Sequence, residues 1–589
     1  MNILFPVAVA AALFVIALRL YPRVISRAFQ EDDGNPPPSE RLADGRDYVK
    51  SRTSVVFGHH FATIAGAGPI VGPTLALAYG WQPVWLWVVI GGIFFGAVHD
   101  MCAMFASVRE DGKSIAEVAH RTLGPVGYLL MILVLIFVLT IINAIFLNLS
   151  VMALTSTYDL DLLHLSADQG LLRTVTEDGV IKGRIGGIAT TSVIIITAFA
   201  PVLAYLIRRR GLSTAMAFLL SSVVAAVSII IGFQFPIVMA GNTWAWVMTA
   251  YVLIAGALPV WLILQPRDFT NVQILYGGLL LICVAAIIAG LRGRGFEAPA
   301  WDIEGGTAAR GLLWPMLFIT VACGAISGFH SLVSSGTSSK QIPRESDCRR
   351  VGYGGMVLES FFAILVLVAV ASMPRGEYLA LVYPEGGAPN WVLGFALGAG
   401  HLINAAIPLI PLAIATVLGI LMIEGFVVTT LDSSVRLCRY MIEEFWVFVF
   451  GGKAPALFRR PEFNVACAVG LMVFFYLNTV IKGLWSVFGA GNQLMAALAM
   501  TTVSVWLVQR ARKHLFALIP ALFMIATTVA ALIILIRANI GTEDKWLLGW
   551  TSAALLFLSV GVVVVGATRF FQAMQANARQ PTPAEAGGS

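Results

Sequence analysis

The stretch VVFGHHFATIAGAGPIVGP, Val55–Pro73, is apolar enough to enter a membrane, yet it cannot form one continuous helix. Its second half is crowded with helix-breaking residues, namely Gly66, Gly68, Pro69, Gly72 and Pro73. Proline removes a backbone donor and clashes with the preceding turn, and glycine weakens the helix further. Inside a bilayer a helix can break only where the freed backbone groups face protein or a water-filled cavity. The stretch therefore predicts a discontinuous span of the kind that forms binding sites in secondary transporters. The alternative is a simple proline kink beside packed histidines.

Most of the chain is as apolar as this stretch. Hydrophobic residues make up 58% of its 589 residues and charged residues only 12%, against about 25% in soluble domains. Long apolar runs recur along nearly the whole length, which predicts an all-α, polytopic bundle of about fifteen membrane-spanning helices. We attribute the net charge of +6 to basic loops between these helices and not to a nucleic-acid partner. The lipid bilayer is thus the first expected partner, and the sequence leaves open whether the chain is a monomer or a homo-oligomer.

The predicted spans lie at 2–21, 54–80, 83–107, 124–153, 186–208, 213–235, 244–264, 271–291, 311–335, 351–373, 408–430, 463–480, 484–508, 515–537 and 546–568. The apolar segment 391–407 is short for a span, so we interpret it as a re-entrant or interfacial helix. With the N-terminus outside and the C-terminus in the cytoplasm, most of the 38 lysines and arginines fall in cytoplasmic loops. This bias predicts a multi-pass protein of the cytoplasmic (inner) membrane.

The ninth span resembles the opening stretch, because it is apolar and then interrupted by Gly324, Ser327 and Gly328. The second and ninth spans run in opposite directions, and each begins a block of five spans. This order predicts a LeuT-like 5+5 inverted repeat with extra helices, in which the first helix of each half is broken. The predicted parts are 1–53 (first span and cytoplasmic linker), 54–235 (first repeat, with an external loop at 154–185 and a hairpin at EDGV), 236–310 (two intervening spans), 311–508 (second repeat, with the re-entrant segment) and 509–589 (two last spans and a disordered tail).

Polar residues at membrane depth are costly and are therefore functional candidates. We expect the substrate to lie between the two broken spans, with a carboxylate at the positive N-terminus of a half-helix. The candidate substrate-binding residues are His59, His60, Thr63, Gly66, Gly68, Ser327, His330, Asn492 and Gln493. Asn492 and Gln493 have a structural alternative, which is to cap or to hold a kink beside Gly489 and Gly491.

A second set of polar residues is suited to ion coupling. Its members are Asp100, Glu359, Thr429, Thr430, Asp432 and Ser433. Histidines titrate near physiological pH and favour proton coupling, whereas the hydroxyl cluster TTLDSS favours sodium, so the ion stays open between H⁺ and Na⁺. As structural alternatives, Asp100 and Glu359 pair with loop arginines, and Asp432 pairs with Arg436 at i, i+4.

Other classes of membrane protein fit less well. The eight histidines are scattered, and the six cysteines contain no CxxC pair, so we expect no metal, no cofactor and no enzyme activity. A channel is disfavoured because discontinuous helices at mid-membrane suit alternating access better.

Long collinear motifs give a family resemblance. They are Asp44–Trp81, Gly96–Asp100, Ala106–Ala119, Ala257–Phe269, Ser327–Ile342, Thr429–Tyr440 and Leu484–Met500. In these motifs the chain resembles the carbon starvation protein (CstA) family. The resemblance implies a transporter of the APC (LeuT-like) superfamily that imports peptides or pyruvate during carbon starvation. Ion-coupled symport is therefore our first hypothesis, and a membrane-embedded nutrient sensor without transport is the alternative.

Overall fold

The computed structural model describes residues 1–589 except 46–47, 178, 260, 480 and 579–589. Within these residues, thirteen helices are long and apolar enough to cross a membrane, and one bent pair of helices raises the number to 14. The spans are α1 (Leu4–Phe29), the bent pair α3 (Thr53–Ile64) and α4 (Gly68–Ala76), α5 (Trp81–Gly91) continued by α6 (Ala97–Arg109), α8 (Pro125–Thr155), α9 (Gly186–Arg210), α10 (Thr214–Gln234), α12 (Leu264–Leu291), α14 (Leu313–Val321) with α15 (Phe329–Gly336), α16 (Gly354–Ala371), α19 (Leu412–Val449), α20 (Pro461–Asn478), α21 (Ile481–Val508), α22 (Leu515–Asn539) and α23 (Trp546–Ala578).

Shorter elements connect the spans. The short helices are α2 (Pro38–Arg41), α7 (Ile115–Leu123), α11 (Gly241–Ala257), α13 (Ile303–Arg310), α17 (Arg375–Val382) and α18 (Trp391–Ala406), and the strands are β1 (Thr157–Asp159), β2 (Thr174–Glu177) and β3 (Val180–Arg184). Helix α7 begins with a capping box, in which the Ser114 hydroxyl accepts a hydrogen bond from the Glu117 N–H.

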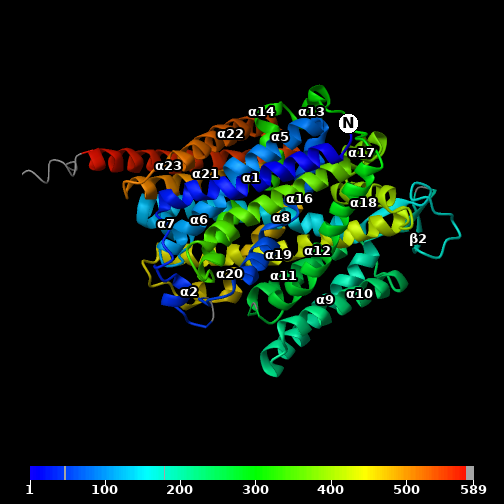
Figure 1. Ribbon diagram of the computed structural model, residues 1–589, viewed down its shortest axis with the longest axis horizontal. Helices are drawn as coiled ribbons and strands as arrows, with labels where there is room; N and C mark the ends of the chain where they lie inside the picture. Colours follow the sequence, from blue (N-terminus) through cyan, green and yellow to red (C-terminus); the bar gives the residue numbers. More distant parts are fainter. Residues whose placement is uncertain (46–47, 178, 260, 480, 579–589) are drawn as a thin grey trace, which may run out of the picture.

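The helical membrane bundle predicted from the sequence is confirmed, while its exact number of spans and the inverted repeat stay predictions. Helix α11 covers part of the predicted span 244–264 but has only 17 residues. The N-terminus and the end of α23 lie at opposite ends of the bundle, which favours an odd number of crossings (Figure 1). Helix α1 continues to Phe29, past its predicted end at 21, so the linker begins later than expected.

Both interruptions predicted from glycine and proline are present. Helix α3 ends at Ile64, and α4 starts at Gly68 with Pro69 in its first turn, after a bend of 46°. The second interruption separates α14 from α15 and contains Ala322, whose φ of 37° no α-helix accommodates. Helix α4 packs against α14, and α3 packs against α15. The two broken spans therefore cross in opposite directions. The interruption in one span packs against the interruption in the other.

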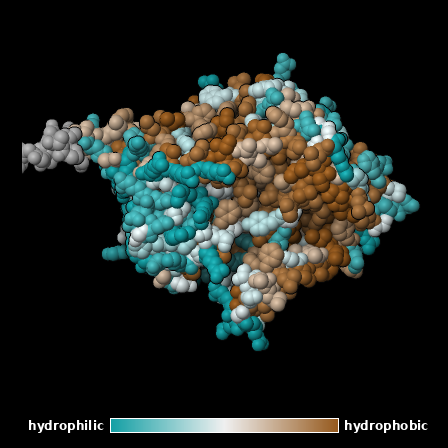
Figure 2. Space-filling model, in the orientation of Figure 1, coloured by the Kyte–Doolittle hydropathy of each residue, from teal (hydrophilic) through white to brown (hydrophobic). Residues whose placement is uncertain are grey.

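The surface agrees with a membrane location. Figure 2 shows a broad hydrophobic band with hydrophilic residues at both ends of the molecule. One hydrophilic end carries α2 and α7, and the other carries the strands (Figure 1). We call these the α7 end, which is the predicted cytoplasmic end, and the sheet end.

The predicted external loop 154–185 folds into a small antiparallel sheet of order β1-β3-β2. The predicted hairpin is present, because β2 pairs with β3, although Asp178 in its turn lies outside the described residues.

Helix α18 has both of its ends near this sheet end: Asn390 donates to Ser156, and the Ala405 carbonyl accepts from Arg292. Its re-entrant interpretation stays a prediction. The predicted disordered tail lies outside the described residues from 579 onward.

Candidate functional site

The first break is in direct contact with two residues of other spans. A Cβ added to Gly66 would come within 2.8 Å of the Thr430 hydroxyl oxygen on α19, and one added to Gly68 would collide with Cys323. The absence of side chains at these glycines lets α19 and the second break approach the backbone. The N-terminus of α4 is thus packed against the second break.

Asn492 on α21 satisfies the backbone that the second break leaves open. Its Oδ1 accepts a hydrogen bond from the Phe329 N–H at 3.0 Å, and its backbone carbonyl accepts one from the Gly328 N–H at 3.1 Å. Its side-chain amide donates to Ser327 at 3.2 Å and to the Cys323 sulfur at 3.3 Å. The structure therefore places Asn492 as a cap for the start of α15, which is the structural alternative expected for it.

A chain of ionisable side chains joins the second broken span to α6 and α16. The Nδ1 of His330, on α15, is 2.9 Å from Oδ2 of Asp100, on α6. The other Asp100 oxygen is 2.7 Å from Nδ1 of His99, and Nε2 of His330 is 3.2 Å from Glu359 on α16. All four side chains are fully buried. The expected pairing of Asp100 and Glu359 with loop arginines is wrong, because both carboxyls face His330 instead.

The backbone at the first break also reaches this chain, which we name the His330 cluster (His99, Asp100, His330 and Glu359). His330 interacts with the backbone of Ile64, the last residue of α3. His60 lies beside it and has its Nδ1 2.9 Å from the Ser338 hydroxyl. A histidine between two carboxyls in a buried site can accept and pass on a proton.

A second buried charge cluster lies on α11, α12 and α19. Nη1 of Arg267 is 2.6 Å from Oδ2 of Asp432, and both side chains are fully buried. The Tyr251 hydroxyl donates to the same Asp432 oxygen at 2.9 Å and also contacts Arg267. Nη2 of Arg267 donates to the Thr429 hydroxyl at 3.0 Å and lies 3.2 Å from Asp268. We name these five residues the Arg267 cluster.

The expected i, i+4 pairing of Asp432 with Arg436 is wrong. The Arg436 guanidinium donates to the carbonyls of Ala255 and Leu258, while Asp432 turns to Arg267. Arg267 is not among the predicted functional residues, because QPRDF lies between two predicted spans, in a short predicted cytoplasmic loop. The sequence signal that could have identified Arg267 is the charged pair of Arg267 and Asp268 between two apolar runs that only a few residues separate.

The remaining predicted residues contribute less to either cluster. Thr63 donates to the His59 carbonyl within α3, and both residues are half-buried. Ser433 is also half-buried. Gln493 is fully buried, and no hydrogen bond of its side-chain amide is found among the described residues. The assignment of these residues to substrate or ion stays a prediction.

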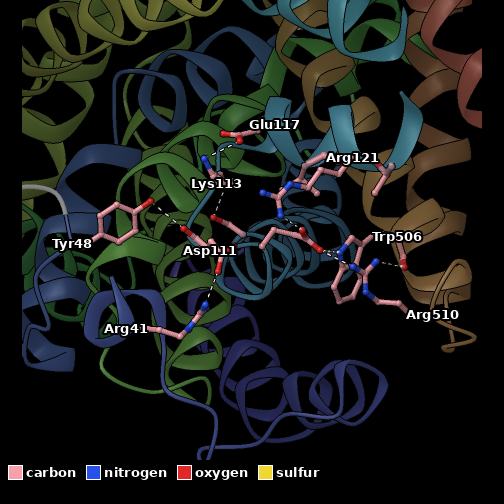
Figure 3. A network of polar contacts seen from close by, with 12 residues as sticks. Arg41, Tyr48, Asp111, Lys113, Glu117, Arg121, Trp506 and Arg510 are labelled. Carbon is pink, nitrogen blue, oxygen red and sulfur yellow. Dashed lines mark hydrogen bonds and ion pairs between the residues drawn. The ribbon is translucent and has the colours of Figure 1, made fainter. Parts of the chain in front are cut away.

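A polar network at the α7 end ties two spans and the short helix α7 together (Figure 3). The Glu110 carboxylate accepts from Arg121 at 2.8 Å, from Arg510 at 2.6 Å and from the Trp506 indole at 2.9 Å. Through these bonds the end of α6 is joined to α7 and α21. Arg41 pairs with Asp111 in the same region.

The chain is similar to several known proteins over most of its length. The chain is 29% identical over 572 residues to the peptide transporter CstA of Bacillus subtilis, covering 90% of this chain and 89% of that protein. It is 27% identical over 612 residues to the pyruvate/proton symporter BtsT of Escherichia coli, covering 90% and 81%. Among solved structures, a manganese transporter of Eremococcus coleocola aligns with a TM-score of 0.44 at 12% identity, covering 90% of this chain and 99% of that one. MhsT in complex with L-phenylalanine aligns with a TM-score of 0.44 at 13% identity, covering 90% and 100%.

The family model described as carbon starvation protein CstA matches residues 2–390 and 385–531. Together these ranges include both broken spans and both charge clusters. The chain therefore belongs to the carbon starvation protein CstA family.

Proposed function

We propose that this chain is a secondary-active symporter that takes up pyruvate or short peptides and couples their uptake to protons. The observation that carries this proposal is the buried His330 cluster, which lies on the second broken span and its neighbours and contacts the backbone at the first break. Discontinuous helices supply partial charges at mid-membrane, and the cluster supplies groups that bind and release a proton. The relatives named above are a peptide transporter and a pyruvate/proton symporter, which supports the two substrate classes.

Protons suit this site better than sodium. The hydroxyl cluster of α19 was the candidate sodium site, yet Thr429 accepts a hydrogen bond from the Arg267 guanidinium. The Thr429 oxygen also accepts from the Asn271 amide at 3.3 Å, so both of its lone pairs are engaged by donors and not free for a sodium ion. The carboxyls of the His330 cluster face a histidine instead, and a histidine can change its own charge.

The orientation is part of the proposal. The N-terminus lies outside and the C-terminus in the cytoplasm of a cell with this protein in its inner membrane. The basic loops supporting this orientation gather at the α7 end. A non-transporting sensor is less well supported, since the relatives named above are transporters by name.

The test is uptake by proteoliposomes that contain the purified chain. Labelled pyruvate and labelled dialanine are each supplied under an imposed pH gradient, a sodium gradient or no gradient. We expect accumulation of at least one substrate under the pH gradient only. Glu359→Gln should abolish pH-driven accumulation but keep the exchange of labelled for unlabelled substrate. Accumulation driven by sodium alone would contradict proton coupling, and binding of substrate without any accumulation would favour the sensor.

A further inference from the structure

Arg267 is an unusual residue for the middle of an apolar bundle. Its side chain is fully buried in α12, a helix that crosses the membrane. A charged side chain at this depth is costly and is kept where it performs a function. Arginine in particular presents a planar fork of donors that matches a carboxylate through two parallel hydrogen bonds.

Asp432 uses only part of that fork. A single oxygen, Oδ2, takes both Nη1 of Arg267 and the Tyr251 hydroxyl. The other oxygen, Oδ1, has no hydrogen-bond partner among the described residues, and neither has Nε of Arg267. The pair of Arg267 and Asp432 therefore uses one carboxylate oxygen, although a guanidinium can bind both oxygens of a carboxylate.

Further polar atoms near the guanidinium are also without partners. Oδ1 of Asn271 has none in the described part of the chain, although its amide donates to Thr429 at 3.3 Å. The carboxyl of Glu424, which interacts electrostatically with Arg267, is fully buried and has no hydrogen-bond partner there either. Buried polar groups without partners are rare in structural clusters and are expected where a ligand completes the site.

Two cavities adjoin the cluster. One has a volume of about 20 Å³ and is lined by Asp268, Asn271, Thr429 and Ala62 of the first broken span. It is the size of one water molecule, so a ligand carboxylate has to replace Asp432 on the guanidinium and cannot simply join it. The other has a volume of about 310 Å³ and is lined by Tyr251 and mostly apolar side chains, among them Leu154, Met248 and Val428. Its volume is in the range of small-ligand sites.

The Arg267 cluster also touches the first break. Thr429 accepts from Arg267, and the next residue, Thr430, packs against Gly66. A ligand on Arg267 would therefore lie beside the interrupted backbone, where a transporter binds its substrate.

We propose that Arg267 binds the carboxylate of the transported substrate and that Asp432 is the internal carboxylate that the substrate displaces. This inference rests on the proposed function, because it assigns the acidic group of pyruvate or of a peptide C-terminus to one residue. It moves the expected anion site from the N-terminus of α4 to α12.

The test compares acids with amides in which a neutral carboxamide replaces the carboxylate. Binding of pyruvate and pyruvamide, and of dialanine and dialanine amide, to the purified chain is measured by calorimetry. The wild-type chain should prefer the acid at least about tenfold, as a charge-assisted bidentate contact allows. The pyruvate and dialanine arms show which carboxylate the site takes.

Three variants isolate the role of Arg267. Because Arg267→Gln alone leaves Asp432 buried without its partner, the double variant Arg267→Gln/Asp432→Asn keeps the net charge of the cluster unchanged and should still fold. It should bind acid and amide equally. Asp432→Asn removes the internal competitor and should bind the acid more tightly than wild type. The matched control is Arg436→Lys, which alters a neighbouring arginine bonded to carbonyls and should keep the preference for acids.

The outcomes separate this inference from the proposed function. A folded double variant that still prefers the acid would overturn the role of Arg267 and return the anion to α4. Weaker acid binding by Asp432→Asn would overturn the displacement. If the wild-type chain binds the acid through Arg267 but accumulates no substrate in proteoliposomes, symport fails while the binding site stands.

Discussion

The Nδ1 atom of His330 lies 2.9 Å from Oδ2 of Asp100, and this contact joins a broken span to an unbroken one at the centre of the bundle. Asp100 accepts from His99 with its other oxygen, so the carboxylate is held from both sides. The same histidine faces Glu359 through Nε2. The position of α15 relative to α6 and α16 is therefore tied to the protonation of His330, Asp100 and Glu359.

Asp100→Asn should lower gradient-driven uptake by about tenfold to a hundredfold, because a hydrogen bond to a charged group contributes about 1.5–3 kcal/mol. The amide cannot accept from both histidines with equal strength. The measurement is initial uptake in proteoliposomes under a fixed pH gradient. The matched control is Asp111→Asn, whose carboxylate is exposed and pairs with Arg41 at the surface. Equal uptake by both variants would show that the charge of Asp100 is not needed.

Asn492→Ala should lower the free energy of unfolding by about 1–3 kcal/mol, since the Phe329 N–H is then left buried without an acceptor. Ser327→Ala keeps that acceptor and removes only the contact between Ser327 and the Asn492 amide, so its effect should be smaller. Thermal unfolding of the purified proteins in one detergent compares the two. Equal losses would mean that the cap on α15 is not what Asn492 contributes.

Asp33, in the linker after α1, gives a pH dependence at the α7 end. Burial raises the pKa of its carboxyl, but hydrogen bonds from the backbone and hydroxyl of Ser346 outweigh this and hold the pKa below the ordinary 3.8. A lowered pKa in the folded state means that its contribution to stability is present above pH 3.8 and is lost as the pH falls through the folded value.

Asp33→Asn should therefore lower the free energy of unfolding at pH 7 by less than about 1 kcal/mol, seen as a small drop in melting temperature, because the contact between Asp33 and Ser346 is exposed. The difference from wild type should shrink as the pH falls below 4, which is roughly the carboxyl's ordinary value. Ser346→Ala removes one of the two hydrogen bonds and should show the same pH profile with a smaller amplitude. A difference that is constant with pH would rule out the ionised carboxylate as its cause.

The sequence predicts the broken spans well, because the rules for glycine and proline are local. Gly66, Gly68 and Pro69 decide where α3 ends and α4 begins, whatever packs around them. Apolar runs likewise mark the spans, since a bilayer requires a fixed length of apolar helix. His330, Asp100 and Glu359 were recognisable as costly polar residues at membrane depth.

Their partners were not predictable in the same way. Arg267 follows a proline between two apolar runs, which is typical of a loop, and only the tertiary packing draws it into α12 beside Asp432. Asn492 likewise caps a helix that is remote in the sequence. Such contacts depend on how spans pack, and neither periodicity nor composition encodes that directly.

The Glu110 network at the α7 end and the Arg267 cluster should differ in how much their loss lowers the free energy of unfolding. Glu110 binds Arg121 and Arg510, whose side chains are 45% and 39% exposed. After Glu110→Gln these guanidinium groups can turn to water and the Trp506 indole keeps an acceptor, so we expect a loss of about 1–3 kcal/mol. Arg267→Gln leaves Asp432 buried and unpaired, so we expect about 3–5 kcal/mol. Melting temperatures of the two single variants, with Arg267→Gln/Asp432→Asn as a neutral reference, measure the difference. If Arg267→Gln is no less stable than that double variant, Asp432 has found water or another partner, and the cluster is more open than its burial indicates.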